Sequence, residues 1–305
     1  MTDLATKMEK VRESFDVEAL IDKDLDEKDV DSYYRYNRLL YKLMLSWKGY
    51  MHMGITRGDS FSKKDLEEIP EIISDYVEDF SEPNVLELGC GTGANLEFLS
   101  TRHEDSSFRG LDKSEKNISK AERKFKKTEN CGVDKGDFHD LSRYENNRFN
   151  LIFVVEALCY SNNKEKVLSE VKRVLKPEGF FLVFDGYMFE DRKTLSEEAF
   201  EAQRLLERSF MLEEFTKYND FLKKASEEGF EVESEEDFSE EIMPTAERYP
   251  TLTNLFFNHS NLNYPLRKIL PEPVKLKAIS AYLMKDLIKN KTDGYYFTAL
   301  RKNEN

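Results

Sequence analysis

Short apolar runs alternate with amphipathic segments through the middle of this chain of 305 residues. Residues 85–88, 149–155 and 180–186 form three such runs, each with the length of a strand buried in a sheet. Between the second and the third, apolar residues recur at three- and four-residue intervals over 164–175, which predicts a helix. A strand, a helix, a Pro-x-Gly turn and a strand in this order predict a crossover between parallel strands.

The same alternation continues on both sides of this unit. Further strands are expected at 106–112, 133–138, 229–234 and 294–303, and further helices at 33–47, 59–80, 113–127, 195–228 and 274–288. This pattern predicts an α/β fold with a seven-stranded, mostly parallel sheet and helices on both faces. We expect four regions: an N-terminal helical cap (1–58), a core (59–240), a helical insertion (241–291), and the last strand with the tail (292–305). The insertion is rich in aromatic residues, so it forms a satellite core, a lid over an apolar pocket, or both.

The sequence NVLELGCGTGANLEFL, which begins at Asn84, reads as strand, glycine turn and helix. Gly89, Gly91 and Gly93 allow a sharp turn and leave backbone N–H groups open to a ligand at the start of the helix. Glu87 places a carboxylate at the strand end, where it can meet an ammonium group or a ribose hydroxyl. The same glycines also satisfy the G-x-G-x-x-A dinucleotide fingerprint, so a nicotinamide or flavin enzyme is an alternative.

Acidic residues lie at the ends of the next two expected strands. Asp112 lies 23 residues past Gly89, close to the spacing of roughly 20 at which an acidic side chain binds the ribose of an adenosine cofactor. It can also cap the following helix, and the two roles are compatible. Asp137 and Phe138 end the third expected strand in a Gly-Asp-Phe sequence, which is either a simple turn or a contact for adenine and its exocyclic amine.

Polar residues also end the fourth and fifth strands. Glu156 directly follows the apolar run at 149–155, and Asp185 lies near the end of the run at 180–186. A protein that only binds a ligand needs no carboxylates there, so these residues favour an enzyme. His52 stands between two methionines and is either a packed residue or a base. The four histidines and three cysteines lack metal-ligand spacing, so we expect no metal site.

Composition narrows the choice of partners. The chain holds 46 Lys and Arg against 60 Asp and Glu, which gives a net charge of −14 and a pI near 5.0. An acidic chain is a poor partner for phosphate backbones, so we expect no nucleic-acid partner. The odd number of cysteines predicts reduced thiols in a cytoplasmic protein. No apolar stretch resembles a signal peptide or a membrane span, so lipid contact is expected to be peripheral at most. The expected oligomeric state is a monomer or a homodimer.

Together these segments resemble the motif series of class I S-adenosylmethionine-dependent methyltransferases. The resemblance rests on VLELGCGTG, GLD, GDF, FNLIFVVEALCYS and VKRVLKPEGFFLVFD, which span residues 83–185. The EALCYS segment and the C-terminal layout are similar to those of the sterol and tocopherol C-methyltransferase group, which implies a Rossmann-like sheet. Where that group commonly carries His, this chain has Tyr160, so the resemblance supports the reaction class better than the substrate.

The resemblance implies S-adenosylmethionine as the cofactor and a role for each motif residue. The expected cofactor-binding residues are Glu87, Gly89, Cys90, Gly91, Gly93, Asp112, Lys113, Asp137, Phe138 and Val155. The catalytic candidates are Glu156, Tyr160 and His52, and the candidate substrate contacts are Tyr33, Tyr34 and Asp185. Glu156 would remove a proton or stabilise a cation, and the aromatic rings would face a cationic intermediate or an amine.

The predicted function is therefore methyl transfer to a small, apolar molecule held in an aromatic pocket, with C- or N-methylation favoured. O-methylation of a small metabolite or a quinone is the first alternative. A non-catalytic regulatory protein that binds S-adenosylmethionine is the second. An NAD-dependent oxidoreductase is the third, and the E-x-G-x-G-x-G form of the glycine turn counts against it.

Overall fold

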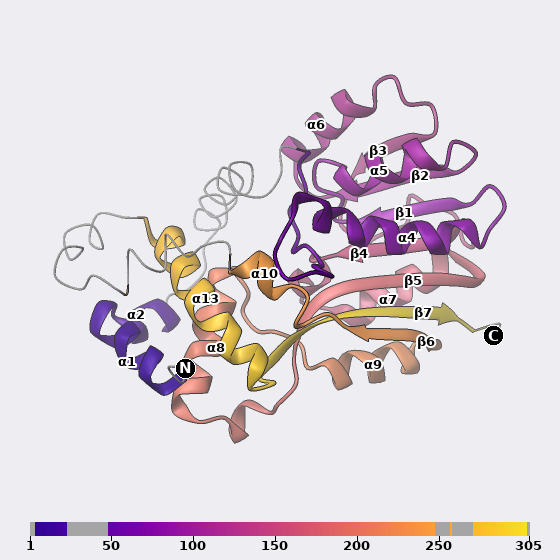
Figure 1. Cartoon of the computed structure of the whole chain (residues 1–305). Coiled ribbons are helices and arrows are strands. Elements are labelled where there is room, and N and C mark those ends of the chain that lie inside the picture. The colour runs from indigo at the N-terminus through magenta and orange to yellow at the C-terminus, as the bar shows by residue number, and fades with distance from the viewer. Residues whose placement is uncertain (1–3, 23–47, 248–256, 258–270, 304–305) are drawn as a thin grey trace.

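A seven-stranded sheet forms the centre of the computed structural model, which describes residues 4–22, 48–247, 257 and 271–303. The strands are β1 (Asn84–Leu88), β2 (Ser107–Asp112), β3 (Cys131–Lys135), β4 (Phe149–Val155), β5 (Leu175–Met188), β6 (Phe230–Asp237) and β7 (Asp293–Lys302). Their order is β3-β2-β1-β4-β5-β7-β6, as Figure 1 shows. The first five run parallel, and β7 is antiparallel to both β5 and β6. The predicted mostly parallel, Rossmann-like sheet is confirmed.

Helices cover both faces of this sheet (Figure 1). On one face lie α4 (Glu68–Glu78), α5 (Ala94–Arg102) and α6 (Glu115–Phe125), and on the other lie α7 (Lys164–Val174) and α9 (Tyr218–Glu227). Val85 and Phe153 belong to the first core, whereas their strand neighbours Leu86 and Ile152 belong to the second. Successive side chains of a strand point to opposite faces, so one strand supplies both cores.

A group of helices stands at one end of the sheet and shares the first core (Figure 1). It consists of α1 (Leu4–Ser14), α2 (Val17–Asp22), α8 (Glu197–Ser209), α10 (Met243–Ala246) and α13 (Glu272–Lys289). Helices α8 and α13 pack along each other, and α1 contacts both. Three short 3₁₀ helices complete the described elements, namely η1 (Lys63–Glu67), η2 (Leu158–Tyr160) and η3 (Arg192–Thr194).

Two predicted elements differ from the structure. The helical region expected at 195–228 consists of two helices, α8 and α9, which pack on different layers. Met211, between them, adopts a left-handed backbone with φ of 58°. The Pro-x-Gly turn expected before β5 lies inside that strand, because Leu175 already pairs with Phe149. Glu178 then takes a positive φ of 60°, and the register shifts before the main part of the strand.

Some predictions fall partly outside the described residues. The helix expected at 33–47, with Tyr33 and Tyr34, lies outside them, and so does much of the aromatic part of the insertion. The division of the chain into cap, core and lid therefore stays a prediction. Among the described helices, none combines the length and the apolar character that a membrane crossing requires.

The glycine turn after β1 provides a test of how tightly this fold is packed. Gly91 and Gly93 both have positive φ, but a Cβ on Gly93 would lie 2.5 Å from the Phe125 ring, whereas a Cβ on Gly91 would meet nothing within 4 Å. We expect Gly91→Ala to lower the free energy of unfolding by about 1–2 kcal/mol. Gly93→Ala should cost about 1–3 kcal/mol more, because Phe125 has to move. Urea unfolding measures both, and equal losses would contradict the packing argument.

Candidate functional site

The carboxyl ends of the parallel strands meet at one edge of the sheet. The strand order reverses between β1 and β4. From β1 the chain crosses one face of the sheet through α5 to reach β2. From β4 it crosses the other face through α7 to reach β5. In open α/β sheets, ligands bind at such a switch point. Asp112 ends β2, Glu156 follows β4, and Asp185 lies near the end of β5, so the predicted acidic residues share this edge.

Hydrogen bonds to β2 hold the glycine turn that follows β1. The Gly89 amide donates to the carbonyl of Leu111 at 2.8 Å, and the Gly91 amide donates to Oδ2 of Asp112 at 2.8 Å. A Cβ on Gly89 would lie 2.6 Å from the Cβ of Ala157, so only glycine lets the turn approach the segment after β4. The open space over Gly91 leaves room for a ligand beside the backbone.

Asp112 ties the glycine turn to the start of α6. Its Oδ1 accepts hydrogen bonds from the Ser114 amide at 2.8 Å and from Nδ2 of Asn117 at 3.3 Å, while its Oδ2 accepts the Gly91 amide. Burial raises the pKa of Asp112, and these three donors act against that rise. A carboxylate accepts about four hydrogen bonds, so one position is left for a ribose hydroxyl. The predicted capping role is wrong, because the N-cap of α6 is Ser114, which Asp112 holds through its amide. The predicted ribose contact stays a prediction.

Asp137 and Phe138 follow β3 and contact a histidine that was not singled out from the sequence. Oδ1 of Asp137 accepts the His139 amide at 3.0 Å and lies 2.6 Å from its Nδ1. Partial burial raises the pKa of Asp137, but these bonds from His139 outweigh it, so the pKa lies below the ordinary value. The exposed Lys113 is 3.7 Å from Oδ2 of Asp137, and Nε2 of His139 lies 2.8 Å from Oγ of Ser161.

Cys90 and Val155 contribute backbone at this edge. The Cys90 side chain points into the core, where a Cβ on Gly110 would lie 2.7 Å from its Sγ. Burial therefore raises the pKa of this thiol well above its ordinary value. Val155 is the half-buried last residue of β4 and packs against the first core.

Glu87 is buried in β1 beside the glycine turn. Its Oε1 accepts a hydrogen bond from Nδ2 of Asn95 at 2.9 Å, and its Oε2 has no hydrogen-bond partner among the described residues. Burial raises the pKa of Glu87 to about 8. A buried oxygen without a donor is the kind of group that a bound ammonium can satisfy. His52 also packs here, with Nε2 3.3 Å from Oδ1 of Asn95, and burial lowers its pKa.

Glu156 turns the chain at the end of β4. Its backbone is left-handed, with φ of 47°, and its amide donates to the carbonyl of Phe184 at 2.8 Å. Oε1 accepts a hydrogen bond from the Met53 amide at 2.6 Å. Loss of solvation raises the pKa of Glu156 to about 7, and the neighbouring Asp185 carboxyl adds to the rise. A carboxyl with this pKa can accept or donate a proton near neutral pH.

A cavity of about 80 Å³ opens beside Glu156 between the sheet and the helices. Its apolar wall comes from α8, α13 and the segments near them, with Leu206, Phe210, Leu212, Phe215, Ile242, Met284 and Ile288. Its polar wall comes mainly from the segment after β4 and from β5 and β7, with Cys159, Tyr160, Asp185, Tyr187, Asp293 and Tyr295. The Tyr187 hydroxyl and Oδ2 of Asp293 are buried without a hydrogen-bond partner among the described residues.

Asp185 and Tyr160 both line this cavity, and Asp185 also has a structural part. Its Oδ2 accepts the Cys159 amide at 2.8 Å, which fixes the short helix η2, and its Oδ1 accepts the Gly186 amide at 2.9 Å. Burial raises the pKa of Asp185. The Tyr160 ring is 39% exposed, and its hydroxyl donates to the carbonyl of Phe210 at 3.1 Å. This bond joins the segment after β4 to the segment after α8.

Lys277 of α13 was missed by the sequence reasoning. It is 6% exposed, and its Nζ lies 4.2 Å from the centre of the Phe210 ring, which lines the cavity. Burial lowers the pKa of Lys277 to about 8, and the Glu156 carboxylate acts against that fall. In sequence, a single lysine in an amphipathic helix reads as a solvated residue, so no local signal marked this position.

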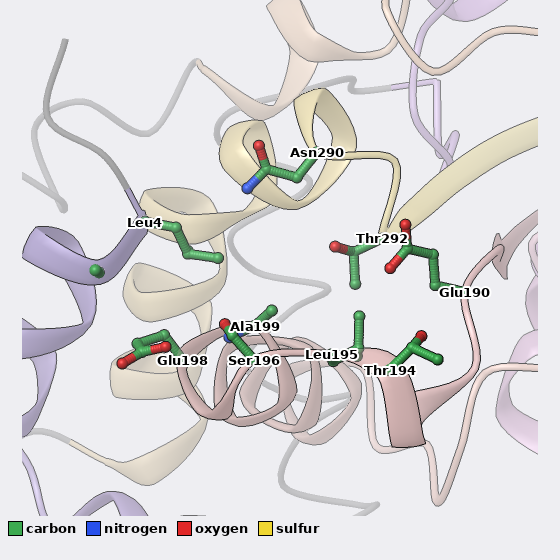
Figure 2. Close-up of a pocket in the computed structure, with 10 residues that line it drawn as sticks. Leu4, Glu190, Thr194, Leu195, Ser196, Glu198, Ala199, Asn290 and Thr292 are labelled. Carbon is green, nitrogen blue, oxygen red and sulfur yellow. The ribbon is translucent and has the colours of Figure 1, made fainter.

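A second hollow, of about 280 Å³, lies between α1, the start of α8 and the end of α13 (Figure 2). Its lining is largely polar, with Glu190, Thr194, Ser196, Glu198, Asn290 and Thr292. It shares no lining residue with the cavity beside Glu156 and contains no predicted site residue. The described residues include no group of three or more His, Cys, Asp or Glu side chains that could hold a metal ion.

The raised pKa of Glu87 predicts a pH-dependent stability. The folded protein without ligand keeps this carboxyl protonated up to a pH of about 8, whereas the unfolded chain ionises it near 4.5. Its contribution to stability is therefore present at low pH and is lost as the pH rises through about 8. We expect Glu87→Gln, which cannot ionise, to gain in melting temperature relative to the unchanged protein between pH 5.5 and 8.5. Glu231→Gln, on exposed β6, is the control, and a pH-independent difference for Glu87→Gln would contradict the prediction.

Comparisons with known proteins agree with this geometry. Residues 79–242, more than half of the chain, match a family described as a methyltransferase domain. The chain is 27% identical over 158 residues to 24-methylenesterol C-methyltransferase 2 of Arabidopsis thaliana. This alignment covers 51% of the present chain and 43% of that relative. It thus spans less than half the length of the curated relatives first matched.

Solved structures of two further proteins share the fold. A cyclopropane synthase from Mycobacterium tuberculosis has a TM-score of 0.68 at 12% identity, over 92% of this chain and all of the other. A geranyl diphosphate C-methyltransferase from Streptomyces coelicolor has a TM-score of 0.63 at 14% identity, over 89% of this chain and 97% of the other. The sequence match over 79–242 and the switch-point site on the same fold lead to one conclusion: the chain belongs to the methyltransferase-domain family.

Proposed function

We propose that this protein transfers a methyl group from S-adenosylmethionine to a carbon or nitrogen atom of a small, largely apolar acceptor. The position of Glu156 carries the proposal. This carboxyl follows β4 at the switch point, next to the strand that leads into the glycine turn, and it lines the cavity whose wall is mostly apolar. A proton-accepting group therefore stands where the cofactor side and the acceptor side of the edge meet.

The residues at the glycine turn fit the cofactor. The buried Oε2 of Glu87 lacks a donor, which an ammonium group of the methionine part would supply. Asp112 keeps one free acceptor position for a ribose hydroxyl, and Gly91 leaves open space beside its backbone. The exposed side of Asp137 would receive the exocyclic amine of adenine. S-adenosylmethionine would supply an electrophilic methyl group to this site.

The cavity supports an acceptor with an apolar body and a polar head. Its volume of about 80 Å³ is below the roughly 300 Å³ at which small-molecule pockets begin, so the cavity has to widen to admit a larger acceptor. The Tyr187 hydroxyl and Oδ2 of Asp293 are placed to bind the polar head, because both are buried without partners. The relatives named for sterol and geranyl diphosphate support an acceptor of this kind, because each name denotes a molecule with a large apolar part and a polar or charged group.

Within this arrangement the chain positions the acceptor and controls a proton. The apolar wall excludes water, which strengthens every electrostatic interaction in the cavity. The Met53 amide holds Oε1 of Glu156 in place, so the carboxylate can take a proton from a nitrogen or carbon of the acceptor, or stabilise a positive charge there. The neighbouring Asp185 carboxyl and Tyr160 ring would also stabilise a positive charge.

The three thiols support a proposal about the compartment in which the protein works. Cys90, Cys131 and Cys159 are free, as expected in a reducing compartment, so we place the protein in the cytoplasm.

Methylation at oxygen would use the same site residues as methylation at carbon or nitrogen, and it remains the alternative that a product analysis would reveal. The family match to a methyltransferase domain disfavours a redox enzyme.

Cofactor binding is testable before the acceptor is known. We expect calorimetric titration to show binding of S-adenosylmethionine and none of NADH. Asp112→Ala should weaken the binding by about 10- to 100-fold, because a charged hydrogen-bond acceptor is worth about 1.5–3 kcal/mol. Asp140→Ala, in the exposed loop after β3, is the matched control and should bind normally. Heat with NADH but not with S-adenosylmethionine would overturn the cofactor assignment.

The role of Glu156 requires a turnover measurement. Transfer of a tritiated methyl group would be followed with a sterol that has an unsaturated side chain, with geranyl diphosphate and with decylamine as acceptors. For any acceptor that is methylated, Glu156→Gln should lower the rate by about 100- to 10,000-fold while the affinity for S-adenosylmethionine stays the same. The unchanged enzyme should gain activity as the pH rises through about 7. An unchanged rate in Glu156→Gln would remove this carboxyl from the mechanism, and Glu231→Gln controls for charge.

A further inference from the structure

A buried segment joins the two sides of the candidate site. Residues 50–56, called the strap below, are buried apart from the half-buried Met51. The Met53 amide holds Glu156, and the amide and carbonyl of Gly54 bond to Oγ1 of Thr245 at 3.1 and 3.0 Å. The strap is therefore fixed both to the carboxyl at the end of β4 and to α10 of the insertion.

The strap also reaches the glycine turn, through His52. Nδ1 of His52 lies 2.9 Å from the carbonyl oxygen of Met53, and its Nε2 lies 3.3 Å from Oδ1 of Asn95. Nδ2 of Asn95 donates to Oε1 of Glu87 at 2.9 Å. Since the Met53 amide bonds to Glu156, an unbroken chain of contacts runs from one carboxyl to the other. We call this path the relay.

With a neutral His52, the relay lacks one hydrogen-bond donor in the arrangement described above. Both ring nitrogens of His52 face oxygen atoms, but a neutral imidazole has only one N–H to donate. If the Asn95 amide is reversed and Glu87 is protonated, all groups are paired. Glu87 then donates to Oδ1 of Asn95, Nδ2 of Asn95 donates to Nε2 of His52, and Nδ1 of His52 donates to Met53.

The protonation of Glu87 therefore decides which way the Asn95 amide points. A protonated Glu87 matches a neutral His52, and an ionised Glu87 matches a His52 with a proton on both nitrogens. Such an amide is a two-state element, which a coupling between two sites requires. Asp112 from β2 favours the protonated form of Glu87, whereas Lys124 from α6 favours the ionised form.

The far end of the relay faces polar and charged groups on three elements. Asp185 of β5 favours a protonated Glu156, while Tyr295 of β7 and Lys277 of α13 favour an ionised one. His52 is in edge contact with the Tyr50 ring, whose centre lies 5.3 Å from that of the imidazole. A positive charge on His52 would add a further cation near Glu156 and would favour its carboxylate form.

We propose that His52 and Asn95 are positioning residues through which cofactor binding at Glu87 prepares Glu156 to act as a base. An ammonium group that arrives at Glu87 favours the carboxylate, so Glu87 releases its proton to solvent, the Asn95 amide reverses, and Nε2 of His52 takes up a proton from solvent. The number of protons in the relay is unchanged. The inference rests on the proposed function, because the ammonium belongs to the methionine part of S-adenosylmethionine.

The test reads His52 and Met53 directly by nuclear magnetic resonance and needs no acceptor. The chain has only four histidines and nine methionines, so ¹⁵N labelling of these two residue types gives few signals. His52→Gln and Met53→Leu assign the two signals. The ligands are S-adenosylhomocysteine, which carries the ammonium group, and 5′-methylthioadenosine, which shares the nucleoside and the sulfur but lacks that group.

We expect S-adenosylhomocysteine to move the His52 Nε2 signal from the range of an unprotonated to that of a protonated ring nitrogen, and to shift the Met53 amide signal. Methylthioadenosine should change neither signal in this way. Asn95→Leu should still bind S-adenosylhomocysteine but lose both changes, whereas Ser100→Ala, a buried polar change on the same helix α5, should keep them. Glu87→Gln, saturated with ligand, should keep His52 neutral even if Asn95→Leu fails to fold.

The outcomes separate the relay from the function on which it rests. An unprotonated Nε2 in the complex would overturn the relay, and so would a change that survives in Asn95→Leu or that methylthioadenosine also produces. Calorimetry on the same samples tests the function itself. If S-adenosylhomocysteine does not bind the unchanged protein at all, the cofactor assignment fails first and the relay fails with it.

Discussion

The parallel pairing of β1 with β4 is the constraint on which the rest of the site depends. Leu88 pairs with Val154, so the two strands end at the same level, and the chain leaves them over opposite faces of the sheet. The turn after β1 then lies against the segment after β4, close enough that a Cβ on Gly89 would collide with Ala157. Glycine at this position, and the left-handed backbone of Glu156, follow from that proximity. A different register would separate the two carboxyls that the strap connects.

Burial of acidic groups at this edge gives the site its chemistry. The chain carries a net charge of −14, and the acidic residues of β6 are all exposed to solvent. Glu87, Asp185 and Asp293 are instead buried, which raises the pKa of each carboxyl. Burial destabilises the ionised form of a carboxyl, because water no longer solvates the charge. A cation that binds beside such a carboxyl can therefore lower its pKa and change its protonation state. The same property makes them poor contributors to stability at high pH.

The helices from the second half of the chain complete the cavity and link it to the sheet. Helix α8 lies between β5 and α9 in the chain, and α13 directly precedes β7. These two helices, far apart in sequence, pack together at this edge of the sheet. They supply the apolar wall, while β5 and β7 supply the buried tyrosines and carboxyls. An apolar wall opposite a polar one suits an acceptor that is apolar along its length and polar at one end. The glycine turn belongs to the parallel half of the sheet, whereas the cavity beside Glu156 needs α8 and α13 for its apolar wall.

The sequence by itself determined the seven strands, the glycine turn and the acidic residues at the strand ends, because strand burial and tight turns are local and leave a periodic pattern. It also determined the family through the motifs over 83–185. Only the tertiary structure decided that His52 packs on Asn95 rather than lining the cavity, that Lys277 is buried, and that α8 and α9 belong to different layers. The positions of His52 and Lys277 depend on contacts between segments more than 40 residues apart in the chain, with Asn95 and Phe210 respectively. Side-chain periodicity within one segment carries no information about such a partner.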